Sequence, residues 1–167
     1  METKRLIINT CSDIVAKDVD AINTDEYEIG SCVGCNHCWL KTPGICALKD
    51  DWEMLFKRVI AADTVVFIAE AKIGFVSYKM KNIVDRLIPI ATPYTVIHKG
   101  EMRHVLRYNN SPNIGLVYAG NGDKEFLTAW LDRVTLNFFS KSLGVYCIEE
   151  SEGITNEFGN IQLLPKA

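Results

Sequence analysis

The sequence lacks the features that point to a membrane, a nucleic acid or several domains. Its 167 residues contain no run of about eighteen apolar residues, the length that a membrane-spanning helix needs. The net charge of −3 offers no basic surface for nucleic acid or for an anionic membrane. Repeats, low-complexity tracts and Gly/Ser-rich or Pro-rich linkers are absent as well. We therefore expect residues 1–167 to form a single domain that binds neither nucleic acid nor a membrane.

A secretory leader and a hydrolytic site are also missing. The opening segment METKRLIINT has only a short apolar run and no small-residue cleavage site. Six cysteines without a leader are typical of free thiols or ligands in a reducing compartment, so we expect a cytoplasmic protein. No Ser-His-Asp set or retained pair of carboxylates is recognisable, and we predict no catalytic side chain.

Short apolar segments predict the strands of a parallel sheet. Four of them are continuous rather than alternating, which is typical of strands buried on both faces. They are residues 5–9, 64–69, 113–120 and 144–148, and a further strand is predicted at 26–30. Five strands are the number found in flavodoxin-like sheets.

Apolar residues at helical spacing alternate with these strands. Three such patterns follow Asp51, Ser77 and Asp123, each of which can cap a helix, and the second ends at Pro89. Between the first two predicted strands there is room only for a short helix over residues 14–22. The alternation predicts a doubly wound α/β sheet with helices on both faces.

Ligands of such sheets lie beyond the carboxyl ends of the strands, where three loops are expected. Residues 9–13 (NTCSD) follow the first strand and open the expected helix, so they are the candidate phosphate site, although they lack glycine. Residues 69–77 follow the third strand. The loop AGNGD at 119–123 fits either a tight turn or close approach to a flat ligand.

Four cysteines lie within fifteen residues of one another, separated by gaps of two, two and seven. They are Cys32, Cys35, Cys38 and Cys46. Four thiolates at this compact spacing can hold a [4Fe–4S] cluster. Zinc is an alternative, with His37 able to replace one thiolate. In a third interpretation the loop is structural and holds no metal, and Trp39 and the cysteines pack as apolar groups. We favour the structural loop and keep the other two open.

The remaining cysteines, Cys11 and Cys147, lie in or beside predicted strands and are expected to be buried and inert. A helix beginning at Cys11 would stabilise its thiolate and make it reactive. The polar segment 98–113 is typical of a binding loop, and only Glu101 and His104 there have the spacing of two metal ligands on a helix.

The segment CVGCNHCWLKTPGIC, followed by KDDWEMLFKRVIAADTVVFIAEAKIGFVSYKMKNIVDRLIPIATPY, resembles a known family. It is similar to the flavodoxin-like NAD(P)H-dependent FMN reductases, nearest to the branch with a C-x-x-C-x-x-C loop that includes iron–sulfur flavoproteins. The match covers about residues 29–120. The resemblance implies strand order 2-1-3-4-5, a homodimer, and FMN at the carboxyl ends of the strands. It also implies electron transfer from NAD(P)H through FMN to a small molecule or a protein acceptor.

The same resemblance implies which residues bind FMN. The phosphate would lie on residues 9–13, and the ring on residues 69–74 and 118–122, with Ser77 and Lys81 behind it. The implied set is Asn9, Thr10, Cys11, Ser12, Asp13, Ala69, Glu70, Ala71, Lys72, Ile73, Gly74, Tyr118, Ala119, Gly120, Asn121 and Gly122.

Two departures from the family pattern open alternatives. The phosphate loop is short, and the family's Pro-x-Tyr falls on Glu70 and Lys72. The leading hypothesis is an FMN-dependent oxidoreductase. One alternative is a flavodoxin-fold protein with a degenerate flavin site that acts as a binding or regulatory subunit. The other is an iron–sulfur flavoprotein that carries electrons, although Trp39 and the KTPG turn resemble the metal-free branch.

Overall fold

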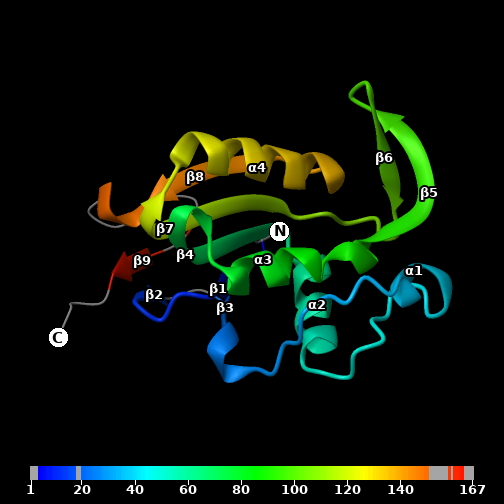
Figure 1. The fold of residues 1–167 in the computed structure, drawn as a ribbon, viewed down its shortest axis with the longest axis horizontal. Helices are drawn as coiled ribbons and strands as arrows, with labels where there is room; N and C mark the ends of the chain where they lie inside the picture. The colour runs from blue at the N-terminus through cyan, green and yellow to red at the C-terminus, as the bar shows by residue number, and fades with distance from the viewer. Residues whose placement is uncertain (1–3, 18–19, 151–157, 159, 164–167) are drawn as a thin grey trace.

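A computed structural model of the chain describes residues 4–17, 20–150, 158 and 160–163. Its centre is a parallel sheet of five strands: β1 (Arg5–Asn9), β3 (Asp20–Asn23), β4 (Thr64–Val76), β7 (Asn113–Gly122) and β8 (Ser142–Cys147). They lie in the order β3-β1-β4-β7-β8 (Figure 1). Counted along the chain, the strands of this sheet follow the order 2-1-3-4-5. The predicted flavodoxin-like α/β class is confirmed.

The second strand is not the segment predicted for it. Residues 20–23 pair with β1 and place Ile22 beside Ile8, whereas residues 26–30 lie outside any strand. A 3-10 turn, η1 (Thr24–Glu26), begins at Asn23, whose side chain accepts from the Asp25 N–H. The strand prediction at 26–30 was wrong because this turn ends the extended backbone before the alternating EYEIG pattern begins.

The three long helices lie where their apolar patterns predict them. They are α2 (Trp52–Ala61), α3 (Tyr78–Asp85) and α4 (Lys124–Asn137), with a single turn, α1 (His37–Leu40), inside the cysteine loop. Asp123 caps α4, and its Oδ1 accepts from the Phe126 N–H at 3.0 Å. Pro89 lies in a 3-10 turn, η2 (Ile88–Ile90), that follows α3. No helix among the described residues is long and apolar enough to cross a membrane.

All three long helices cover the same face of the sheet. Alternate strand residues such as Leu6, Ile8 and Phe67 pack with buried side chains of α2, α3 and α4 in one apolar core. Their neighbours, such as Ile7 and Val66, point to the opposite face and pack in a second, smaller core. Within the described residues, the prediction of helices on both faces was therefore wrong.

A second, two-stranded sheet covers the opposite face. Strand β2 (Ile14–Lys17) pairs antiparallel with β9 (Asn160–Leu163), and Phe158 and Ile161 complete the smaller core. Only residues 10–19 separate β1 from β3, which is too few for a helical crossover between parallel strands. The helix predicted over 14–22 is replaced by β2 for this reason.

Strands β4 and β7 extend beyond the segments predicted for them and stay paired at their carboxyl ends. Glu70 pairs with Ala119 and Ala71 with Gly120, and after an irregularity Gly74 pairs with Gly122. Gly120 has φ +93°, and a Cβ there would lie 2.7 Å from the Ala71 carbonyl oxygen. The glycine thus permits close approach of another strand, so neither the expected loop at 69–77 nor the turn at 119–123 forms.

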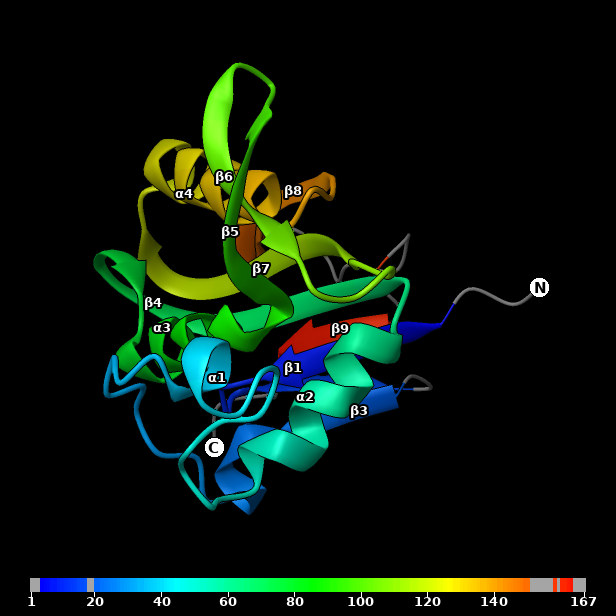
Figure 2. The same ribbon diagram turned by 90° about the vertical axis from the view of Figure 1, so that its right-hand side faces the viewer.

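The polar segment after α3 is a β-hairpin rather than a loop. Strands β5 (Ala91–His98) and β6 (Glu101–Leu106) pair only with each other and project from the rest of the chain (Figure 2). Lys99 and Gly100 form the tip, both with positive φ. Several apolar side chains of this hairpin are exposed: Tyr94, Val96, Ile97, Met102 and Val105.

Candidate functional site

The cysteine loop brings four thiols to one small hollow. Cys32, Cys35, Cys38 and Cys46 all line it, together with Pro89 and residues near the ends of α1 and α3. Cys38 is buried, Cys46 is half-buried and the other two are exposed, and all four are free. The structure therefore places the four predicted ligands around a common space.

The four thiols influence one another electrostatically. Burial raises the pKa of the Cys38 thiol, and the nearby Cys46, Cys32 and Cys35 raise that pKa further. The thiolate form of Cys38 is therefore favoured only when positive charge lies nearby. A metal ion or cluster supplies such charge, and it binds the thiolate form of cysteine.

The side chains are near one another but not at ligand distances. Within the described part of the chain, no three or more His, Cys, Asp or Glu side chains are close enough to hold a metal ion as they stand. Cys32 and Cys35 lie on the exposed segment before α1, where rotation of their side chains meets little hindrance. His37, the alternative zinc ligand, is exposed and lies outside the lining of the hollow.

Arg86, which the sequence analysis did not single out, also lines the hollow. Its side chain is 1% exposed and pairs with the Asp50 carboxylate through both terminal nitrogens, at 2.8 and 2.9 Å. Its Nη1 also donates to the Gly30 carbonyl oxygen at 2.5 Å. Gly30 and Asp50 are the two ends of the cysteine loop, so Arg86 holds both ends at the end of α3.

The wall of the hollow contains an unsatisfied donor. The Nε of Arg86 is buried and has no hydrogen-bond partner in the described part of the chain. Buried polar groups are nearly always paired, so an orphaned guanidinium N–H beside four thiols fits an anionic group bound among them. The donor set and this N–H together suit a thiolate-bound cluster with net negative charge.

Trp39 and the turn after α1 fix the loop from the other side. The Trp39 indole N–H donates to the Ile88 carbonyl at 2.9 Å, and the ring lies against His104 with centroids 4.5 Å apart. The Gly44 N–H donates to the Cys38 carbonyl, which closes the turn. These residues shape the loop without filling the hollow.

A cleft at the carboxyl edge of the sheet corresponds to the predicted flavin site. Its volume is about 380 Å³, and it is lined by Thr10, Cys11, Ser12, Asp13, Glu70, Lys72, Val76, Ser77, Tyr78 and Lys79. The structure thus brings together the predicted phosphate loop and part of the predicted ring-binding segment. Residues 118–122 do not line this cleft because they pair with β4.

The predicted phosphate loop is closed by its own hydrogen bonds. The Thr10 hydroxyl donates to the Ile68 carbonyl at 3.0 Å, and the Asn9 amide donates to the Ile14 carbonyl at 2.7 Å. The Cys11 N–H donates to the Asn9 side chain at 2.9 Å. Since strand β2 follows instead of a helix, the expected helix N-terminus is absent and the free N–H groups it would offer a phosphate are absent with it.

Carboxylates occupy the carboxyl edge where an anionic ligand was expected. Asp13 and Glu70 both line the cleft, and Lys72 is already paired with Glu70 at 3.0 Å. Glu149 accepts from the Gly120 N–H at 2.8 Å, at the end of β7, and from the Cys147 thiol at 3.1 Å. As folded, this edge does not fit a phosphate well.

Cys11 and Cys147 are buried, as predicted. Burial raises the pKa of the Cys11 thiol, and the charges of Asp13, Glu70 and Glu149 raise it further, although the Asp13 N–H opposes this. Burial likewise raises the pKa of Cys147, with the Glu149 carboxylate as the next cause. Both thiols stay protonated at neutral pH, which makes them poor nucleophiles.

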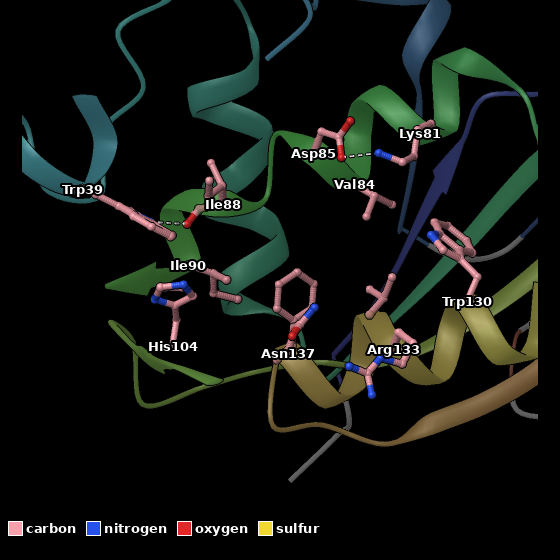
Figure 3. Close-up of a pocket in the computed structure, with 13 residues that line it drawn as sticks. Trp39, Lys81, Val84, Asp85, Ile88, Ile90, His104, Trp130, Arg133 and Asn137 are labelled. Carbon is pink, nitrogen blue, oxygen red and sulfur yellow. Dashed lines mark hydrogen bonds and ion pairs between the residues drawn. The ribbon is translucent and has the colours of Figure 1, made fainter. Parts of the chain in front are cut away.

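A third cavity, of about 470 Å³, lies between α3, α4 and the base of the hairpin (Figure 3). Trp39, His104 and Trp130 give it aromatic walls, and Ile88 borders both this cavity and the cysteine hollow. Its lining comes from α1, α3, η2, β5, β6 and α4, segments far apart in the sequence. No local motif could therefore have predicted it.

No family model matches this chain. Curated relatives are named as iron–sulfur flavoproteins. One from Archaeoglobus fulgidus is 29% identical over 117 residues, covering 70% of this chain and 47% of that protein. Another, MJ1083 from Methanocaldococcus jannaschii, is 26% identical over 97 residues, covering 56% and 49%. A second A. fulgidus protein is 35% identical over 69 residues, covering 41% and 33%. The chain spans about half the length of the first two relatives.

Among solved structures, the crystal structure of Smu.1420 from Streptococcus mutans UA159 superimposes with a TM-score of 0.50. The two chains are 11% identical over 90% of each, so this likeness concerns the fold alone. The sequence matches carry the relationship further. The homologues of this chain are iron–sulfur flavoproteins, which confirms the branch that its cysteine loop and helix motifs resemble.

Proposed function

We propose that this chain is an electron carrier of the iron–sulfur flavoprotein kind, in which Cys32, Cys35, Cys38 and Cys46 hold an iron–sulfur cluster. The observation that carries the proposal is the common hollow of the four thiols, with the unpartnered N–H of Arg86 in its wall. The relationship to iron–sulfur flavoproteins supports a flavoprotein electron carrier. When bound, a [4Fe–4S] cluster would supply one-electron exchange.

This proposal departs from the structural loop favoured by the sequence. That preference relied on Trp39 and the KTPG turn. Both make contacts in the fold that do not involve the four thiol groups. Trp39 attaches α1 to η2 and to the hairpin, and the turn closes on the Cys38 carbonyl. Neither competes with a ligand for the four thiols.

The chain's own residues would prepare the hollow in two ways. The ion pair of Arg86 with Asp50 fixes both ends of the loop, which lowers the entropy lost when four thiolates converge. Pro89, Ile88 and the buried side of Cys38 form an apolar wall. Such a wall limits access of water and thereby affects the potential of a bound centre.

The test is anaerobic purification followed by reconstitution with iron and sulfide. We expect about four irons per chain and broad absorbance near roughly 400 nm. Cys38→Ser should remove most of the iron, whereas Cys147→Ser, which alters a buried thiol outside the loop, should retain it. Colourless protein without iron after reconstitution would contradict the proposal.

The two flavin hypotheses make opposite demands on the carboxyl edge. An FMN-dependent oxidoreductase that takes electrons from NAD(P)H needs the cleft beside residues 10–13 to bind FMN. A binding or regulatory subunit with a degenerate flavin site needs no flavin, and the carboxylates Asp13, Glu70 and Glu149 favour it. An FMN dissociation constant below about 1 μM, roughly −8 kcal/mol, would support the oxidoreductase and remove the degenerate-site alternative.

Association into a homodimer stays a prediction. The exposed apolar side chains on the β5–β6 hairpin support it, because a two-stranded hairpin is marginal unless something packs against it. The mass of the purified protein in solution would decide between a dimer and the 18.8 kDa chain alone.

A further inference from the structure

Arg86 is the only buried charged side chain among the residues that the structure describes. A guanidinium has five N–H groups in a fixed planar fork. The terminal nitrogens of Arg86 bond to Asp50 and to the Gly30 carbonyl, while the Nε–H is buried and has no partner within residues 4–17, 20–150, 158 and 160–163. The loop clamp therefore uses three of the five N–H groups and leaves the Nε–H and one Nη2–H for something else.

The position of this donor limits what could accept from it. Arg86 lines the hollow with all four loop cysteines, and the remaining lining is largely apolar or made of loop backbone. The indole of Trp52 lies on the guanidinium, 5.9 Å from its ring centroid to Cζ, and its N–H donates to the Arg86 carbonyl, which restrains the side chain. A group held in the hollow would lie beside this guanidinium and is the acceptor that the lining offers.

We propose that the Arg86 Nε–H donates a hydrogen bond to a sulfur of the thiolate-bound cluster, and that Arg86 is a positioning residue which raises the reduction potential of that cluster. The inference rests on the proposed function. A cluster becomes more negative on reduction, so a fixed cation and an N–H···S hydrogen bond stabilise the reduced form more than the oxidised form. The second role of Arg86, holding the ends of the loop, would exist without any cluster.

A variant pair separates the two roles. Arg86→Gln removes the charge and the donor, and Arg86→Lys retains the charge without the planar fork. Arg133→Gln is the matched control, because it removes an exposed arginine on α4 that pairs with Glu101 outside the hollow. All are measured as the full chain reconstituted with iron and sulfide.

At a fixed solution potential, we expect Arg86→Gln to lower the ratio of reduced to oxidised cluster at least tenfold, which is about 59 mV for one electron. Arg86→Lys should recover less than half of this shift, and Arg133→Gln should lie within twofold of the unmodified protein. An Arg86→Gln cluster with an unchanged potential would overturn the inference. Full recovery in Arg86→Lys would also overturn it, since charge alone would then account for the effect.

Because Arg86 is buried, its variants can fail to fold, and a measurement on the unmodified chain keeps the inference testable. Cadmium ion binds thiolates and is diamagnetic, so the Arg86 Nε–H can be followed by ¹⁵N NMR during titration with Cd²⁺. We expect a downfield shift of this proton on binding. An unmoved signal with bound cadmium would overturn the inference. Protein that takes up cadmium but no iron would contradict the proposed function and, with it, the effect on the reduction potential. An unmoved Nε–H signal in protein that does take up iron would contradict the inference alone.

Discussion

The cysteine hollow and the carboxyl-edge cleft differ in how far their polar groups are already satisfied. At the hollow, four thiols are free and the Arg86 Nε–H has no hydrogen-bond partner among the residues that the structure describes. At the cleft, the Thr10 hydroxyl is engaged by a backbone carbonyl and Lys72 by the Glu70 carboxylate. Elsewhere on the same carboxyl edge, the Gly120 N–H is engaged by another carboxylate. The cleft is thus the larger of these two spaces, but polar groups that line it already bond to other parts of the protein.

The difference shows that volume is a poor guide to a binding site in this fold. A ligand gains from groups that are buried, oriented and unpaired, because their desolvation has already occurred. The cleft of about 380 Å³ offers few such groups, and its carboxylates repel a phosphate. The hollow is smaller, yet it contains the buried Cys38 thiol and lies beside the buried Nε–H of Arg86.

The largest expected effect is a loss of folding stability when the ion pair beside the hollow is broken. Asp50→Ala leaves the Arg86 charge buried without its partner, which costs about 3–5 kcal/mol in the free energy of unfolding. Urea denaturation of the apoprotein measures this loss. The matched control is Asp85→Ala. Asp85 precedes Arg86 at the end of α3 and pairs with Lys81 at the exposed surface of that helix.

For Asp85→Ala we expect a loss below about 0.5 kcal/mol, as is usual for an exposed pair four residues apart on a helix. A similar loss in both variants would contradict the assignment of Asp50 and Arg86 as the clamp of the cysteine loop.

A smaller effect on flavin affinity is expected from a change on the carboxyl edge of the sheet, outside the lining of the cleft. Glu149→Ala releases the Gly120 N–H and removes one negative charge from the carboxyl edge. A hydrogen bond to a charged group contributes about 1.5–3 kcal/mol, so riboflavin and FMN should bind roughly tenfold more tightly or better. Quenching of flavin fluorescence measures both affinities.

Glu150→Ala is the control for this variant. Glu150 is the neighbouring carboxylate and pairs with Lys124 at 3.4 Å, so its removal changes the net charge equally and leaves the Gly120 N–H engaged. Equal flavin affinities in the two variants would show that the amide contact is irrelevant to flavin binding.

The smallest effect concerns an exposed contact on the hairpin. The Arg133 guanidinium, helped by Arg103, lowers the pKa of Glu101 from 4.5 to about 2. Because the folded-state pKa lies below the unfolded value, the stabilisation is complete above pH 4.5 and is lost as the pH falls towards about 2. Thermal unfolding of Glu101→Gln should therefore depend less on pH in this window than that of the unmodified chain.

Salt should reduce this difference, since exposed charges are screened at about 0.5 M ionic strength. A difference between the two proteins that persists in high salt would contradict the exposed character of the pair.

The sequence predicted the elements whose residues are buried on both sides. The continuous apolar runs at 64–69 and 113–120 give the central strands, and the helical stripes after Asp51, Ser77 and Asp123 give α2, α3 and α4. The strand at 20–23 was missed because DAIN has one large apolar residue, Ile22. Its formation depends on pairing with β1 rather than on its own pattern.

The candidate site was also predictable only in part, because some of its contacts depend on residues distant in the sequence. The spacing of the four cysteines is local and points to a shared hollow, which the structure contains. Arg86 ends a helix, where an arginine is ordinarily solvated, and its role depends on Asp50 thirty-six residues earlier. The hydrogen bond from the Gly120 N–H to the Glu149 carboxylate likewise joins two segments that no sequence motif connects.

The pairing of β2 with β9 determines when one face of the sheet can become protected during folding. Ile14 is the register partner of Leu163, so strands made at opposite ends of the described chain must pair before the core of Ile7, Val66 and Ile68 is covered. Contacts so distant in sequence close slowly. During synthesis this apolar face of the sheet stays open to solvent until residues 158–163 have been made, and in that interval the nascent chain is vulnerable to aggregation.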